Sequence, residues 1–216
     1  MTARTRIKFC GLVRPGDVDD AVALGVDAIG FVFYPKSPRA LTPEAAAGLR
    51  RRLPSWVSAV GLFVNAPPVE VTATARAVGL DVLQLHGDET PERCAETGLA
   101  AGLPWWKAFR MRAETDLLSS AGSFGAAECL VLDAFSDGYG GSGRAFDWSW
   151  IPPGLPARIV LSGGLDAGSV ADAIGRVRPF AVDVSSGIQG DDPRTKDRAR
   201  MERFVAAVLA ADAPEP

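Results

Sequence analysis

Histidine and cysteine are scarce in this chain, which has one histidine, His86, and three cysteines, Cys10, Cys94 and Cys129. One histidine cannot build a histidine-based zinc site, and the cysteines lack the paired spacing of a thiolate site. A Ser-His-Asp hydrolase is excluded unless His86 supplies the whole base function alone. We therefore expect a protein that uses no metal and no other cofactor, with thiols kept reduced in the cytoplasm.

Long hydrophobic runs are also missing. The longest one, from Ala28 to Tyr34, is far shorter than the roughly 18 to 20 residues that a membrane span requires. The first six residues include two arginines, but neither an apolar stretch nor a small-residue cleavage site follows them. The sequence thus predicts neither membrane insertion nor secretion, and we expect a cytoplasmic protein.

Neither sign of charge dominates, because 23 Lys and Arg residues against 26 Asp and Glu residues give a formal net charge of −3. Nucleic-acid-binding surfaces are typically basic, so the composition predicts no nucleic-acid partner. Apolar residues make up 47% of the chain and charged residues 23%, which allows a sizeable core. A long coiled coil is excluded by 23 glycines and 16 prolines.

Apolar, β-branched runs recur on average about every 25 residues, the spacing of strand and helix units. They begin near Ile7, Ala28, Val57, Val82, Trp105, Cys129, Arg158 and Ala181. Helix starts lie between them, with Thr42, Thr90 and Asp166 as expected N-caps. The runs are apolar at nearly every position, as parallel strands covered on both faces must be. Trp105 and Trp106 are expected to pack between these strands and the helices.

Eight such units predict an α/β protein with a closed eight-stranded parallel sheet, a (β/α)8 or TIM barrel. We expect one domain over residues 1–216, with 1–5 and 211–216 as frayed tails. An open doubly wound sheet is the alternative fold. It usually needs a glycine-rich phosphate turn after its first strand, and Cys10-Gly11-Leu12 is not such a turn.

Barrel enzymes place their chemistry at the C-terminal ends of the strands, and polar residues and glycines gather there in this sequence. Ser162-Gly163-Gly164 follows the seventh predicted strand and Ser185-Ser186-Gly187 follows the eighth. These two loops are where barrels commonly bind phosphate, because glycine permits close backbone approach and backbone N–H groups donate to the anion. Gly163, Gly164, Ser185, Ser186 and Gly187 are therefore the predicted phosphate-binding residues.

With these motifs in place, the chain resembles the phosphoribosylanthranilate isomerase family of tryptophan biosynthesis. The resemblance runs from about Arg6 to Val208 and rests on Lys8–Gly11, Gly30–Arg39, Val60–Asn65, Leu83–Gly87, Leu132–Asp133, Tyr139–Gly143, Phe146–Trp148, Leu161–Gly164 and Val182–Gly187. Three residues depart from the usual pattern: Leu12, Ser162 and Gln189 stand where the family commonly has Ile, Ala and Glu.

The resemblance implies a cofactor-free Amadori rearrangement of a small phosphosugar, N-(5-phosphoribosyl)anthranilate, to an open-chain aminodeoxyribulose phosphate. It implies that Asp133 is the general acid that opens the ring and that Cys10 is the general base that removes the C2′ proton. It also implies that Arg39 binds the anthranilate carboxylate, with Gln84 and His86 facing the substrate. We count Asp183 among the substrate-binding candidates.

The residues themselves also allow purely structural roles. Cys10 is also typical of a small core residue, Arg39 of a solvated loop and His86 of a satisfied structural histidine. Asp133 is a poor helix-cap candidate, because the next helix signal lies more than ten residues on. As a base, Cys10 must be a thiolate, which requires nearby positive charge. Lys8 lies on the same strand face as Cys10, but we expect it to pair with Asp183 on the adjoining strand.

Other functions remain alternatives at this stage. The analogous aldose-ketose isomerase of histidine biosynthesis uses two aspartates in a two-fold repetitive chain, and ribulose-phosphate epimerase needs metal-binding histidines. A non-catalytic barrel that senses a phosphate ligand is a third alternative. The glycine-rich segment Asp137–Arg144 is a candidate lid, and we expect a monomer, with a homodimer as the alternative.

Overall fold

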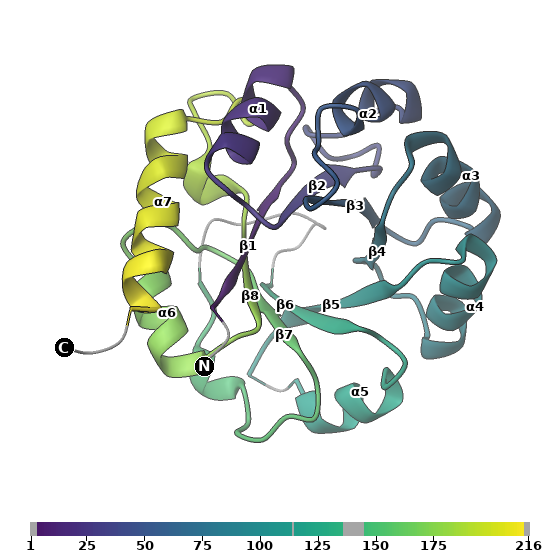
Figure 1. Cartoon of the computed structure of the whole chain (residues 1–216). Coiled ribbons are helices and arrows are strands. Elements are labelled where there is room, and N and C mark those ends of the chain that lie inside the picture. The colour runs from purple at the N-terminus through teal and green to yellow at the C-terminus, as the bar shows by residue number, and fades with distance from the viewer. Residues whose placement is uncertain (1–3, 114, 136–144, 214–216) are drawn as a thin grey trace.

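Eight parallel strands close into a barrel in the computed structural model, which describes residues 4–113, 115–135 and 145–213 (Figure 1). The strands pair in chain order, and the last pairs with the first. They are β1 (Arg6–Cys10), β2 (Ala28–Val32), β3 (Ser58–Phe63), β4 (Val82–Leu85), β5 (Trp105–Met111), β6 (Cys129–Ala134), β7 (Ile159–Leu161) and β8 (Ala181–Val184). The predicted fold is confirmed, and each strand begins within one residue of its expected start.

Helices surround the barrel (Figure 1). They are α1 (Pro15–Ala23), α2 (Pro43–Arg50), α3 (Pro68–Val78), α4 (Pro91–Ala101), α5 (Leu117–Ser123), α6 (Val170–Val177) and α7 (Arg198–Ala211). Thr42 and Thr90 cap α2 and α4 as predicted, because each side-chain oxygen accepts a hydrogen bond from a backbone N–H of the first turn. Within the described ranges, no helix combines the length and apolar composition needed to span a bilayer.

Two connections differ from the prediction. Asp166 does not cap α6, which begins at Val170 with Ser169 as its N-cap. The Asp166 carboxylate instead accepts from the N–H groups of Gly168 and Ser169 and so stabilises the turn before the helix. Between β6 and β7 the described residues form only the short 3-10 helix η1 (Trp148–Trp150). The candidate lid Asp137–Arg144 and the motif Tyr139–Gly143 lie outside the described residues.

The two tryptophans of β5 face opposite ways. Trp105 packs on α4, where a Cβ added at Gly98 would lie 2.3 Å from Cδ1 of Trp105. Trp106 belongs to a separate inner cluster with small side chains such as Ala28 and Ala181, so its expected place between strands and helices is wrong. Successive residues of a strand point to opposite faces, which puts Trp106 inside the barrel.

A contact joins Thr5, just before β1, to Asp212, just after α7. Thr5 is 6% exposed and donates from its backbone N to Asp212 Oδ2 at 2.7 Å and from Oγ1 to Asp212 Oδ1 at 2.8 Å. A carboxylate just past α7 therefore satisfies the polar groups of Thr5 next to β1. The frayed tails over residues 1–5 and 211–216 stay a prediction. Residues 1–3 and 214–216 lie outside the described ranges.

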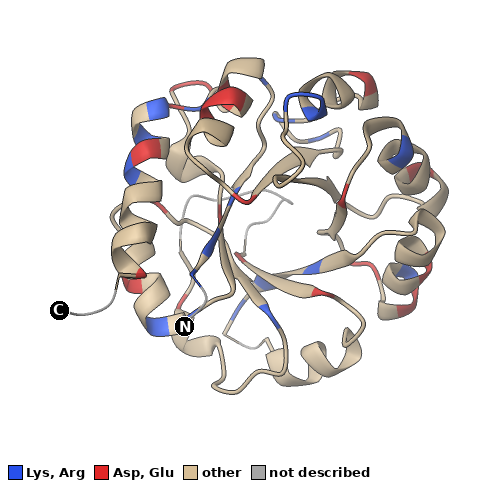
Figure 2. Ribbon diagram, viewed as in Figure 1, with Lys and Arg blue, Asp and Glu red and all other residues tan. Residues whose placement is uncertain are grey.

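Charges of both signs occur on the outer helices (Figure 2). Arg52, just after α2, pairs with Asp19 of α1, and Arg198 of α7 pairs with Asp20 of α1. Such exposed pairs stabilise the fold little individually. Buried charged side chains occur near the C-terminal ends of strands, among them Asp133 of β6 and Asp183 of β8.

The contact between Thr5 and Asp212 generates a stability prediction. Asp212→Ala leaves two polar groups of Thr5 without their partner, so the free energy of unfolding should fall by about 1–3 kcal/mol. Urea denaturation measures the change, and Asp191→Ala, which removes an exposed carboxylate, is the control. Equal free energies of unfolding for the two variants would show that the contact of Thr5 with Asp212 does not stabilise the fold.

Candidate active site

One cavity opens at the C-terminal ends of the strands. Its lining is contributed by Cys10, Val32, Ser37, Arg39, Leu62, Gln84, His86, Asp133, Ser162, Gly163, Gly164, Leu165, Asp183, Val184, Ser185 and Ser186. All the predicted site residues except Gly187 are among them, and Gly187 lines an adjoining pocket together with Gly164 and Ser186. The structure therefore brings the candidates together, while their chemical roles stay predictions.

A buried ion pair lies beside this cavity. Lys8 Nζ is 2.8 Å from Asp183 Oδ2, and the two side chains are 2% and 5% exposed. They sit opposite each other in the register of β1 and β8, which confirms the pairing expected from the sequence. Burial disfavours the ammonium, but the attraction of Asp183 and Cys10 outweighs it and raises the pKa of Lys8.

Cys10 ends β1 beside Lys8. A Cβ added at Gly30 of β2 would lie 2.7 Å from Cys10 Sγ and 3.2 Å from Lys8 Nζ, so only glycine leaves room for both side chains. Burial raises the pKa of the Cys10 thiol, and Asp183 adds to this, although Lys8 and Lys196 act in the opposite direction. The positive charge that the sequence called for is present, but burial outweighs it.

Asp133 ends β6 and contacts the predicted histidine. Its Oδ2 lies 3.2 Å from His86 Nε2, and its Oδ1 accepts from the backbone N of Ala134. Gln84 Nε2 lies 2.9 Å from His86 Nδ1. An amide NH2 can only donate, so it places the imidazole proton on Nε2, directed at Asp133. Asp133 caps no described helix, since the cap of η1 is Asp147.

Two acceptor atoms in the cavity wall lack partners. Gln84 Oε1 and Asp183 Oδ1 are buried and accept no hydrogen bond from any described residue. Buried polar atoms are normally satisfied, so two such atoms in one cavity are exceptional. They are suited to accept hydrogen bonds from the hydroxyl groups of a bound molecule.

Arg39 is held at the rim of the cavity. Its Nε donates to Pro193 O at 3.0 Å, and its Nη2 donates to Gln189 Oε1. Burial lowers the pKa of Arg39, with Cys10 acting against the change. The freely solvated arginine of the alternative interpretation is therefore wrong, and its side-chain partner is a neutral amide.

The two glycine loops approach each other closely. Gly163 and Gly164 have positive φ values of 83° and 67°, which favour glycine. A Cβ at Gly163 would lie 2.9 Å from Asp133 Oδ1, and one at Gly187 would lie 2.0 Å from Leu165 O. The adjoining pocket is also lined by Arg200 and Arg203, which sequence reasoning missed because they stand in an ordinary helical pattern.

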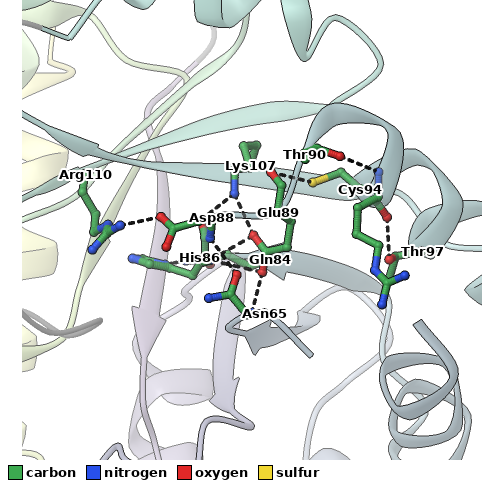
Figure 3. Close-up of polar contacts among 12 residues, drawn as sticks. Asn65, Gln84, His86, Asp88, Glu89, Thr90, Cys94, Thr97, Lys107 and Arg110 are labelled. Atoms are coloured by element: carbon green, nitrogen blue, oxygen red, sulfur yellow. Dashed lines mark hydrogen bonds and ion pairs between the residues drawn. The ribbon is translucent and has the colours of Figure 1, made fainter. Parts of the chain in front are cut away.

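A second buried ion pair fixes the loop that follows His86 (Figure 3). Lys107 Nζ lies 2.7 Å from Glu89 Oε2 and donates to Gly87 O, and both charged side chains are almost fully buried. Glu89 Oε1 accepts from the backbone N of Asn65, and Asn65 Oδ1 accepts from the backbone N of Asp88. The exits of β3, β4 and β5 are thus joined, and the direction of His86 is set.

Lys196 is a further buried residue that sequence reasoning missed. It stands one residue before Asp197, the N-cap of α7, and nothing in the local pattern separates it from a loop lysine. Within the described ranges, no group of three or more His, Cys, Asp or Glu residues could hold a metal ion.

Comparisons with known proteins agree with this geometry. Residues 7–207 match the family model N-(5'phosphoribosyl)anthranilate (PRA) isomerase. The N-(5'-phosphoribosyl)anthranilate isomerase of Ralstonia nicotianae is 55% identical, over 97% of this chain and 95% of that one. A crystal structure of phosphoribosyl anthranilate isomerase with reduced 1-(o-carboxyphenylamino)-1-deoxyribulose 5-phosphate has a TM-score of 0.84 and 37% identity, over 95% of this chain and 99% of that one. A crystal structure of monomers generated from the dimeric Thermotoga maritima isomerase has a TM-score of 0.83 and 37% identity, over 95% of this chain and 98% of that one.

The ion pair of Lys8 and Asp183 predicts a coupled stability effect. Lys8→Met leaves the buried Asp183 charge without its partner and should lower the free energy of unfolding by about 3–5 kcal/mol. The double variant Lys8→Met/Asp183→Leu removes both charges and should recover most of that loss. Urea denaturation of wild type, both single variants and the double variant completes the cycle. Additive losses would contradict a direct interaction between the two side chains.

Proposed function

The chain belongs to the N-(5'-phosphoribosyl)anthranilate isomerase family of tryptophan biosynthesis, and from this premise we propose that Asp133 and Cys10 carry out its two proton transfers. The protein is an aldose-ketose isomerase, which converts N-(5-phosphoribosyl)anthranilate into 1-(2-carboxyphenylamino)-1-deoxyribulose 5-phosphate. The reaction needs an acid at the furanose ring oxygen and a base at C2′.

The observation that carries the proposal is the placement of Cys10 and Asp133 on one cavity but on strands that are not neighbours. β7 and β8 separate β6 from β1, so a sugar bound in the cavity can lie between the two side chains. An acid on one side and a base on the other can then serve different atoms of the same substrate.

Asp133 suits the role of the acid better than the other cavity carboxyl. Asp183 forms an ion pair with Lys8, whereas Asp133 contacts an imidazole and a backbone N–H. Protonation of the ring oxygen by Asp133 breaks the bond from that oxygen to C1′ and gives a Schiff base. The His86 contact holds the carboxyl group in position for this step.

Cys10 then acts as the base. Its thiolate takes the C2′ proton, and the electron pair of the C–H bond forms the enolamine, which tautomerises to the keto product. Cys10 is 7% exposed and lines the cavity, so it is screened from bulk water but open to the ligand.

The remaining candidates would hold the two ends of the substrate and its hydroxyl groups. The guanidinium group of Arg39 fits the anthranilate carboxylate, since it can donate two parallel hydrogen bonds. Gln84 Oε1 and Asp183 Oδ1 are the acceptors for sugar hydroxyl groups. The phosphate would lie against Gly163, Gly164 and Ser185–Gly187, where glycine leaves backbone N–H groups accessible. The reduced product-like ligand bound to the related crystal structure supports a site of this extent.

We also propose a monomeric protein of the reducing cytoplasm that needs no cofactor. The three cysteines are buried and unpaired, which fits a reducing compartment. The most exposed large apolar side chains of the described residues are spread over different elements, among them Trp56, Val69, Leu99, Leu118 and Leu209. A homodimer remains the alternative, because the Thermotoga maritima relative is dimeric, and sedimentation equilibrium distinguishes the two.

The purified chain should consume phosphoribosylanthranilate with no added cofactor. The loss of substrate fluorescence measures the rate. A chelator should leave the rate unchanged. Activity that disappears with the chelator and returns with zinc or magnesium would contradict the cofactor-free mechanism.

Asp133→Asn tests the acid. Asn keeps the shape and a polar contact but has no proton to give to the ring oxygen, so kcat should fall by roughly 10²–10⁴ with little change in KM. Steady-state kinetics by the fluorescence assay measure both constants. Asp147→Asn is the control, since Asn caps a helix as well as Asp does. A wild-type kcat in Asp133→Asn would assign the acid to another group.

Arg39→Ala tests the carboxylate site. Loss of a charged hydrogen-bonding partner should raise KM roughly 10-fold to 150-fold, corresponding to about 1.5–3 kcal/mol of binding, with a smaller change in kcat. Arg51→Ala removes an exposed arginine at the end of α2 and is the control for net charge. An unchanged KM would mean that the anthranilate carboxylate is held elsewhere.

A further inference from the structure

Lys196 differs from the other buried lysines of the described residues. Lys8 and Lys107 each lie within 2.8 Å of a carboxylate oxygen. Lys196 is 6% exposed, yet no carboxylate of the described residues lies within ion-pair distance of its Nζ. Among the described residues its Nζ donates only to Ser185, to O at 2.8 Å and to Oγ at 3.3 Å. A buried ammonium without an anion is unfavourable, so this one requires an explanation.

The surroundings of Lys196 connect it to Cys10. Ser185, which accepts both of its hydrogen bonds, donates from Oγ to the backbone O of Cys10 at 3.0 Å. Cys10 and Lys196 are also close enough to influence each other electrostatically. The lysine is therefore linked to the proposed base through Ser185, which lies just after β8 and contacts the end of β1.

The carboxylates near Cys10 and Lys196 are already paired with other cations. On the strand of Cys10, Lys8 is paired with Asp183 of β8, and near Lys196 the carboxylate of Asp17 in α1 is paired with Arg14. Arg39, from the loop after β2, is a cation and is held by the neutral Gln189. The negative charge that would balance Lys196 is thus the one that appears when Cys10 loses its proton.

We propose that Lys196 is a positioning residue for proton abstraction, whose ammonium group stabilises the thiolate of Cys10 that takes the C2′ proton. Lys8 cannot supply this alone, because Asp183 offsets its charge. The inference rests on the base role proposed for Cys10, but the effect of Lys196 on the thiol is measurable without turnover.

The direction of the titrations fits this arrangement. Burial, followed by repulsion from Arg39, lowers the pKa of Lys196 to about 7, while Cys10 and the nearby aspartates act in the opposite direction. Burial raises the pKa of Cys10. Each charged form therefore depends on the other, because the thiolate favours the ammonium and the ammonium favours the thiolate. Removal of the lysine charge should shift formation of the thiolate to higher pH.

Alkylation of Cys10 by iodoacetamide tests the inference, because the thiolate is the reactive form. The rate is followed against pH, without substrate, by mass spectrometry of the peptide that contains Cys10. Lys196→Gln keeps a donor for Ser185 and removes the charge, and Lys196→Arg keeps the charge. Arg51→Met removes an exposed charge and is the control. Lys196→Met provides a second neutral variant should Lys196→Gln not fold.

We expect Lys196→Gln to shift the alkylation profile to higher pH by about one unit, a roughly tenfold lower rate below the midpoint. Its kcat should fall by a similar factor with KM little changed. Lys196→Arg should keep the alkylation profile near that of wild type, and Arg51→Met should have the wild-type profile. A wild-type alkylation profile in a folded neutral variant overturns the inference. A wild-type kcat in Cys10→Ala would instead overturn the base role of Cys10. That outcome would leave the alkylation result unchanged, because alkylation is measured without turnover.

Discussion

The ion pair of Lys8 and Asp183 is the constraint on which the geometry of the site depends. It joins the first and last strands inside the barrel, at the level where the apolar interior ends and the cavity begins. A charge at such depth is tolerated only with its partner in place. The pair therefore fixes the position of Cys10 at the end of β1 and of Ser185 just after β8, and Ser185 is the acceptor for Lys196 Nζ.

The opposite wall of the cavity is fixed by the same kind of interaction. Lys107 and Glu89 are buried together and hold the loop that follows His86, while Gln84 orients the imidazole toward Asp133. Glycines allow these charged groups to come close, since any side chain at Gly30 or Gly163 would meet Cys10 or Asp133. Asp133 and Cys10 are thus held by two separate polar networks within one barrel.

The sequence predicted the strands well because parallel strands covered on both faces are apolar at nearly every position, a pattern that needs no tertiary information. The alternation of Leu83 and Leu85 with Gln84 and His86 is equally local, and it puts both polar side chains on one face. The sequence failed where a contact depends on distant chain segments. Asp212 reaches Thr5, and the backbone N of Lys196 reaches Asp17, only because the barrel closes, and no local pattern distinguishes Asp212 or Lys196 from a surface residue. The predicted position of Trp106 between strands and helices is wrong because strand alternation points it inward when Trp105 points outward.

The contact of Thr5 with Asp212 brings the beginning and the end of the described chain together across the seam of the barrel. When the two ends of a closed barrel lie close together, they can be joined, and the chain can begin at another loop without changing which strands pair. A short linker between the ends, with new termini opened in an exposed loop between a helix and the following strand, would keep every strand pair and both polar networks. The barrel is therefore a natural scaffold for circular permutation.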